Sequence, residues 1–171
     1  MKKILLTAVN AKYIHSNLAV YSLRAYAREL KENIVLAEYT INNRTEYILR
    51  EIYLKKPDVI CFSCYIWNIS IILEVAEEFH KLCPKVPIWV GGPEVSYEVE
   101  AFLKEHPFIT GVIIGEGEKT FSELCRYYVK GEGSLEEMKG IALFDGAGNV
   151  QIHESVSYTH LRAHETSLHL V

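Results

Sequence analysis

The chain has 171 residues, of which 49% are hydrophobic and 23% charged, and its formal net charge is -4. This length suits one globular domain with a single core. No stretch concentrates lysine and arginine, so the sequence lacks the basic surface expected of a protein that binds nucleic acid or an anionic membrane. No apolar run is long enough for a membrane span, and the apolar run near the N-terminus leads directly into a helical pattern instead of a cleavage site. We therefore expect a cytoplasmic protein.

Short β-rich runs alternate with amphipathic segments from residue 3 to about residue 130. The five runs are KILLTAV (3–9), IVLAEY (34–39), DVICFS (58–63), PIWVGG (87–92) and GVIIG (111–115). Between them, apolar residues recur at helical spacing, as in Val20, Leu23, Ala27 and Leu30, and in Ile69, Ile72, Leu73, Ala76 and Phe79. This alternation predicts an α/β protein with a doubly wound, five-stranded parallel sheet, flavodoxin-like or Rossmann-like.

Three polar residues precede helical patterns and are candidate N-caps. Asn43 stands three residues before Glu46 in the spacing of a capping box, and Asn68 and Ser96 each precede a helical segment. We expect each of them to cap the helix that follows.

The C-terminal part divides into a ribbon and a tail. After the break KGEGS, residues 140–154 read as two short strands around a DGAGN turn. The tail is rich in histidine, but its segment VSYTHLRAHET (156–166) resembles the translation of a transposon adapter used in sequencing, so we exclude it from the fold. We therefore expect an α/β domain over 1–133, a β-ribbon leading to a missing domain over 134–155, and a non-native tail over 156–171.

Cys61 and Cys64 form a C-x-x-C motif, which in other contexts is a redox pair or half of a zinc site. Here the motif lies within a strand-like run, where cysteine packs as a small apolar residue, and no further ligands follow at short spacing. We interpret both cysteines as core residues.

Ligands of open α/β sheets bind outside the carboxyl ends of the strands, which here means segments 10–17, 63–68, 91–97 and 115–118. A classical dinucleotide site needs G-x-G-x-x-G after the first strand, but the first glycine of the chain is Gly91. A phosphoryl-transfer site of the response-regulator kind needs carboxylates where the chain has Asn10 and Ser63. FMN stays open, although the first loop supplies only Ser16 and Asn17 for a phosphate, and so does a domain with a protein-interaction role alone.

Small residues at three strand ends predict a slot in this edge of the sheet. Ser63 ends the third run, Gly91 and Gly92 end the fourth, and the sequence GEGE (115–118) follows the fifth. His15, Tyr65, Trp67 and Pro93 would surround the slot with a partly apolar rim that suits a broad, flat ligand.

Four motifs occur in a specific order: NAKYIHS (10–16), FSCYIWN (62–68), GGPEVSY (91–97) and GEGE (115–118). In this order they resemble the N-terminal cobalamin-binding (vitamin B12-binding) domain of cobalamin-dependent radical SAM enzymes, over residues 1 to about 154. The resemblance implies that the nucleotide tail of cobalamin, detached from cobalt, occupies a slot beside Ser63, Gly91 and Gly92. The cofactor-binding residues that it implies are Asn10, Lys12, Tyr13, His15, Ser16, Ser63, Cys64, Tyr65, Trp67, Gly91, Gly92, Pro93, Glu94, Gly115, Glu116 and Gly117.

His15 corresponds to the histidine of the motif D-x-H-x-x-G, which binds cobalt from below in cobalamin-binding folds. Tyr13 stands here in place of the aspartate and Leu18 in place of the glycine. The resemblance thus implies one of two roles for His15: an axial ligand of cobalt, or a contact with the underside of the corrin.

The resemblance also implies that a radical SAM domain in cis, missing here, carries a 4Fe-4S cluster and S-adenosylmethionine and performs methyl transfer or a radical rearrangement. The cluster motif C-x-x-x-C-x-x-C does not occur in this sequence. We therefore expect this chain by itself to bind a corrinoid but to be catalytically inert. An FMN-binding electron-transfer domain and a non-catalytic interaction domain are the alternatives.

Overall fold

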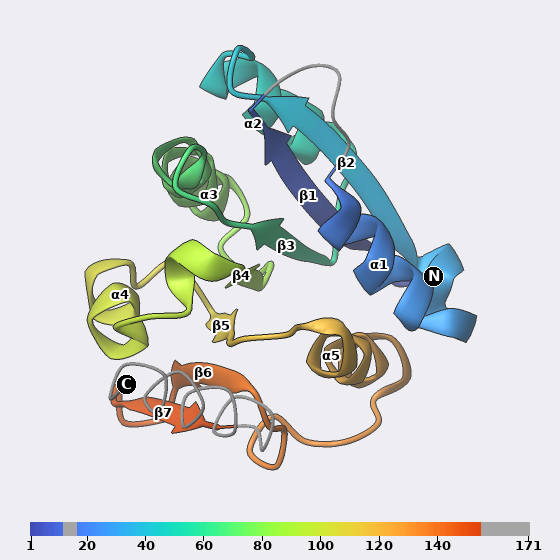
Figure 1. Ribbon diagram of the computed structural model, residues 1–171, viewed down its shortest axis with the longest axis vertical. Helices are drawn as coiled ribbons and strands as arrows, with labels where there is room; N and C mark the ends of the chain where they lie inside the picture. The colour runs from blue at the N-terminus through green and yellow to red at the C-terminus, as the bar shows by residue number, and fades with distance from the viewer. Residues whose placement is uncertain (12–16, 155–171) are drawn as a thin grey trace, which may run out of the picture.

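The computed structural model describes residues 1–11 and 17–154. Five helices alternate with the strands in the order that the sequence predicts (Figure 1). The strands are β1 (Ile4–Asn10), β2 (Ile34–Thr40), β3 (Val59–Ser63), β4 (Ile88–Gly91), β5 (Gly111–Ile113), β6 (Ile141–Phe144) and β7 (Val150–His153). The helices are α1 (Leu18–Tyr26), α2 (Thr45–Leu54), α3 (Ile69–Leu82), α4 (Val99–Glu105) and α5 (Glu118–Lys130), with short 3-10 helices η1 (Arg28–Asn33) and η2 (Pro93–Val95).

The strands form one sheet in the order β2-β1-β3-β4-β5-β6-β7. The first five strands are parallel, and their order 2-1-3-4-5 is that of flavodoxin-like folds, which confirms the predicted fold class. The five predicted parallel strands and the short ribbon that follows them are both present, and the ribbon extends the sheet of the described residues to seven strands. β6 pairs with β5 in antiparallel register, so that the ribbon covers an edge that would otherwise expose unpaired backbone groups.

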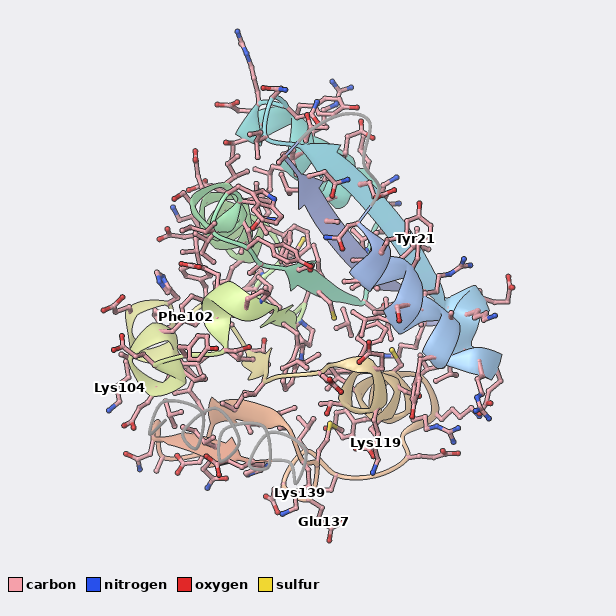
Figure 2. The ribbon with its side chains drawn as sticks, viewed as in Figure 1. Tyr21, Phe102, Lys104, Lys119, Glu137 and Lys139 are labelled. Carbon is pink, nitrogen blue, oxygen red and sulfur yellow. The ribbon has the colours of Figure 1, made fainter. Side chains whose placement is uncertain are left out.

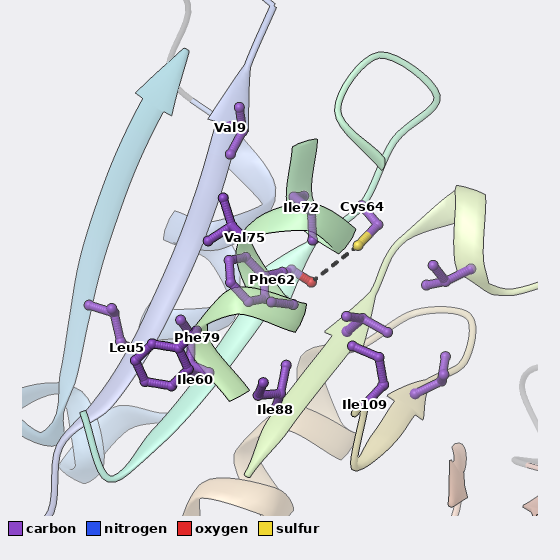
Figure 3. Packing of buried hydrophobic residues seen from close by; sticks show 14 of the residues in the cluster. Leu5, Val9, Ile60, Phe62, Cys64, Ile72, Val75, Phe79, Ile88 and Ile109 are labelled. Carbon is purple, nitrogen blue, oxygen red and sulfur yellow. Dashed lines mark hydrogen bonds between the residues drawn. The ribbon is translucent and has the colours of Figure 1, made fainter. Parts of the chain in front are cut away.

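Helices cover both faces of the sheet: α1 and α5 lie on one face, and α2, α3 and α4 on the other (Figure 1). Residues of one strand alternate between the two cores. Leu6 packs with α1 and α5, whereas Leu5 and Val9 pack against the α3 side, where Phe62, Ile72 and Phe79 also lie (Figure 3). Because both faces of the central strands are buried, β3, β4 and β5 consist almost entirely of apolar residues and glycine.

The two cysteines of the C-x-x-C motif face opposite sides of the sheet. Cys61 lies in the core beside α1 and α5, whereas Cys64 lies in the other core and donates its thiol to the carbonyl of Phe62 over 3.9 Å (Figure 3). Burial raises the pKa of both thiols far above the ordinary value, so they stay protonated. They are core residues, and the described residues contain no cluster of three or more His, Cys, Asp or Glu that could hold a metal.

None of the three expected N-caps makes a capping bond: Asn68 occupies the N-cap position of α3 without a side-chain bond to that helix, and the other two residues do not occupy the cap position. α2 begins at Thr45 after Arg44, while the side chain of Asn43 accepts a hydrogen bond from the amide of Thr40 over 2.8 Å and so closes the preceding turn. α4 is preceded by Glu98, and Ser96 holds two loops together instead, as described below. In the part of the chain that the structure describes, no helix is long and apolar enough to span a membrane.

Gly111 gives a test of this packing, because the ring of Trp89 lies directly over it. A Cβ at Gly111 would lie 2.7 Å from Cη2 of Trp89 and 2.8 Å from the carbonyl oxygen of Ala142, and the buried indole has no room to shift. We expect Gly111→Ala to lower the free energy of unfolding by about 1–3 kcal/mol, measured by urea denaturation. Gly146→Ala is the matched control, since nothing lies within 4 Å of its added Cβ. Equal stability of the two variants would contradict the packing described here.

Candidate functional site

A cavity of about 230 Å³ opens at the carboxyl edge of the sheet, on the face covered by α1 and α5. Strands β1, β3, β4 and β5 form its base, and the first two turns of α1 and the first turn of α5 close its sides. It thus lies where the strand order reverses between β1 and β3, the position at which open α/β sheets bind ligands.

The base of the cavity consists of two rows of residues that lie side by side across the strands. In the row at the mouth, Ser63 is paired with Gly91 and Gly91 with Ile113. In the row at the floor, Leu6 is paired with Cys61 and Cys61 with Trp89. Successive residues of a strand point to opposite faces, so these two rows, two residues apart, both face the cavity.

The two consecutive glycines have different reasons to be glycine. Gly91 belongs to the mouth row, where a Cβ would only touch Cβ of Ile113 at 3.4 Å, so its effect is to leave space. Gly92 has a φ of 113°, and a Cβ there would collide with the carbonyl oxygen of Cys64. At position 92 the backbone conformation requires glycine. At position 91 glycine is required because a side chain would fill the open space of the cavity.

Ser96 joins the loops after β4 and β5. Its hydroxyl donates to the carbonyl of Gly92 over 2.7 Å and accepts from the amide of Gly115 over 3.4 Å. The second loop continues through Glu116 and Gly117 to the start of α5, and all three of its residues line the mouth. Carboxylates at this position are stabilised by the positive end of the helix dipole.

Asn68 precedes α3, but its side chain makes no capping bond to that helix. It is fully buried, and its amide nitrogen donates to the carbonyls of Val9 and Ser63 over 2.9 and 3.1 Å. Its amide oxygen accepts from the backbone of Tyr65 over 2.8 Å. One side chain therefore ties the end of β1 to the end of β3 and fixes the loop that carries the aromatic rim.

That rim consists of Tyr65 and Trp67, whose rings stack with centroids 4.5 Å apart and planes 4° from parallel. Tyr65 lines the cavity, and Trp67 stacks on its outer side with 46% of its surface exposed. The pair gives the mouth a flat, apolar border.

Glu38 of β2 holds the two ends of the segment that joins β1 to α1. Its carboxylate accepts from the side chain of Asn10 over 3.2 Å, from the amide of Asn17 over 3.0 Å and from the hydroxyl of Tyr21 over 2.8 Å. Tyr21 projects from α1 on the side of β2 (Figure 2). Burial alone would raise the pKa of Glu38, but these donors outweigh it and lower the pKa below the ordinary value, so the carboxylate is ionised at neutral pH.

The structure brings half of the predicted site residues to the cavity wall: Ser63, Tyr65, Gly91, Gly92, Pro93, Gly115, Glu116 and Gly117. Asn10, Cys64, Trp67 and Glu94 lie outside the wall. Lys12, Tyr13, His15 and Ser16 lie outside the described residues. For all of them, a role in cofactor binding stays a prediction.

Sequence reasoning missed most of the apolar wall. Four of these residues could have been found from the sequence, because each lies an even number of residues before a predicted site residue at the end of its own strand or in the loop that follows. They are Leu6, Cys61, Trp89 and Ile113. Ala19, Leu23 and Phe121 come from the helices, and their position depends on how α1 and α5 pack against the sheet.

The model of a known family, the B12 binding domain, matches residues 4–125. The chain belongs to this family. The match confirms the predicted cobalamin-binding module, and it gives no support to FMN as the ligand. It covers β1 to the middle of α5 and so includes every segment that lines the cavity.

Two methyltransferases are among the similar proteins. Over 91 residues the chain is 31% identical to the cobalamin-dependent radical SAM methyltransferase TokK of Streptomyces tokunonensis. Over 90 residues it is 37% identical to 2-(S-pantetheinyl)-carbapenam-3-carboxylate methyltransferase of Streptantibioticus cattleyicolor. Each match covers 53% of this chain and 13% of the relative, so the chain spans only a small part of the length of these proteins.

The fold is similar to that of a solved structure, the cobalamin-dependent S-adenosylmethionine radical enzyme OxsB with aqua-cobalamin and S-adenosylmethionine bound. The TM-score is 0.69 at 23% sequence identity, and the match covers 90% of this chain and 23% of that one. This structural match covers a larger share of the chain than the family model, which ends within α5. The larger share agrees with a sheet that continues beyond α5.

Asn68→Ala tests whether the buried amide holds the strand ends together. The variant leaves two carbonyls and one amide buried without their partner, so we expect it to lower the free energy of unfolding by about 2–4 kcal/mol in urea denaturation. Asn42→Ala, at an exposed asparagine, should stay within about 0.5 kcal/mol of the parent. A loss at Asn68 no larger than that at Asn42 would show that the amide has no such role.

Proposed function

We propose that this chain binds cobalamin with the nucleotide tail in the 230 Å³ cavity and with the mouth residues next to the corrin. The observation that carries this proposal is the gap in the mouth row. Ser63 and Gly91 leave space between the edge of the sheet and a cavity with apolar walls, in a domain that belongs to the B12-binding family. A thin group can pass this gap, and a side chain larger than serine in either position would obstruct it.

The residues of the chain then have separate tasks. Leu23 and Phe121 close the sides of the cavity from the helices and exclude water from the tail. Tyr65 and Pro93 border the mouth, where an apolar face can lie against a flat ring. Bound cobalamin supplies a cobalt centre that can carry a methyl group or take part in radical chemistry.

We further propose that the chain is the cobalamin-binding part of a radical SAM protein whose other domain holds a 4Fe-4S cluster and S-adenosylmethionine and transfers a methyl group. Two relatives that are named as methyltransferases support this proposal. By itself the chain has no catalytic role. Its four free cysteines suit the reducing environment of the cytoplasm, where we place it.

Incubation with hydroxocobalamin or with FMN, followed by desalting, tests the ligand. We expect the visible spectrum of a corrinoid to stay with the protein and that of flavin to be lost. Gly91→Leu, which fills the gap in the mouth row, should abolish retention of cobalamin while the far-ultraviolet circular dichroism stays unchanged. Gly146→Leu, in the open turn before β7, is the control and should retain it. Retention of flavin alone, or of cobalamin by the Gly91 variant, would overturn the proposal.

For His15 we propose a contact with the underside of the corrin without coordination of cobalt, because Tyr13 and Leu18 replace the residues that accompany a coordinating histidine. His15→Ala should then leave the absorption maxima of bound cobalamin unchanged and weaken its affinity by roughly two- to tenfold. His80→Ala, on α3 at the opposite face of the sheet, should change neither quantity. A shift of the maxima in the His15 variant alone would instead assign cobalt ligation to His15.

A further inference from the structure

The floor of the cavity differs chemically from its mouth. Among the described residues that line it, the polar side chains all come from the carboxyl edge of the sheet, the loops beyond it or the first residue of α5; they are Ser63, Tyr65, Glu116 and Glu118. The floor row, two residues deeper, consists of Leu6, Cys61 and Trp89. Phe121 and Leu23 cover this floor from the helices, so the deep end of the cavity presents carbon and sulfur.

The polar atoms of the floor are already engaged or weak. The indole nitrogen of Trp89 donates to the hydroxyl of Tyr128 over 2.9 Å, and Tyr128 does not line the cavity. The thiol of Cys61 is buried and is a poor hydrogen-bond donor and acceptor. A polar group that entered the floor would lose water and find no strong partner there.

The floor is also rigid. Trp89 is fully buried, and its ring lies against Gly111, where even a Cβ would not fit. Cys61 is 4% exposed and Leu6 is 3% exposed. These side chains cannot rotate to offer a different surface without disturbing the core beneath α5.

From this arrangement we infer that the cavity selects the lower base of the corrinoid: it accepts the apolar benzimidazole of cobalamin and disfavours a purine such as adenine. This inference rests on the proposed position of the nucleotide tail. The far edge of 5,6-dimethylbenzimidazole carries two methyl groups, whereas adenine carries ring nitrogens and an exocyclic amine that need hydrogen-bond partners. Burial of such groups without partners weakens binding by about ten- to a hundredfold.

The test compares the dissociation constants of three corrinoids on the same protein: aquacobalamin, its adenine analogue pseudocobalamin, and cobinamide, which has no nucleotide. We expect cobalamin to bind about ten- to a hundredfold more tightly than pseudocobalamin, and cobinamide to bind more weakly than cobalamin. If cobalamin and pseudocobalamin bind equally and cobinamide binds more weakly, the cavity holds the tail but does not select the base, and the inference alone is wrong. If cobinamide binds as tightly as cobalamin, the tail does not use the cavity, and the proposed function of the site is wrong as well.

Cys61→Ser probes the floor directly, because it replaces the thiol by a hydroxyl of similar size that both donates and accepts. We expect this variant to reduce the ratio between the two dissociation constants by at least threefold. Cys125→Ser is the matched control: Cys125 is 1% exposed, lies in the same core and does not line the cavity, so its replacement should leave the ratio unchanged. The measured quantity is the ratio of two dissociation constants on the same variant. A general loss of stability weakens the binding of both corrinoids alike and therefore leaves this ratio unchanged. An unchanged ratio in the Cys61 variant would show that the floor row does not read the base.

Discussion

The register between β3 and β4 is the constraint on which the site depends. It places Ser63 beside Gly91 at the mouth and Cys61 beside Trp89 at the floor. If one of these strands slipped by one residue, its two cavity residues would turn to the opposite face of the sheet, against α3, and both rows would be broken. The cavity is therefore a property of strand pairing first and of individual side chains second, and the apolar core on the other face, which holds Phe62 and Val90, resists such a slip.

The same register explains how much of the molecule could be predicted. Alternation of apolar runs and helical stripes is a local signal, and it predicted the parallel strands and the apolar stripes of the two segments that contain α1 and α3. Glycines and a serine at strand ends predicted the mouth of the cavity, since the carboxyl ends of parallel strands meet at one edge. Cys61 and Trp89 were recoverable by counting back two residues from Ser63 and Gly91, but that they lie side by side follows only from the register of the two strands.

Other features depend on contacts between distant parts of the chain. Asn68 has the sequence position of a helix cap, yet its amide reaches the carbonyl of Val9, 59 residues earlier, because the ends of β1 and β3 lie side by side. Asn43 has the spacing of a capping box, but its side chain instead accepts a hydrogen bond from the amide of Thr40 in the turn after β2. The sequence indicates the two strands of the ribbon, β6 and β7, but it does not indicate what they pair with. In the structure β6 pairs with the edge of β5 that would otherwise be unpaired.

The two added strands, β6 and β7, determine the edge of the sheet at which the backbone leaves the domain. β6 runs against β5 and β7 runs against β6, so β7 points the same way as the parallel strands. Through this double reversal His153 is aligned, by way of Ile141, with Ile113 of the mouth row. The backbone thus leaves β7 at the edge of the sheet where the cavity opens, about 10 Å from β5. A single added strand would have directed the backbone to the opposite edge, whereas the two strands together bring it back to the edge at which the parallel strands end.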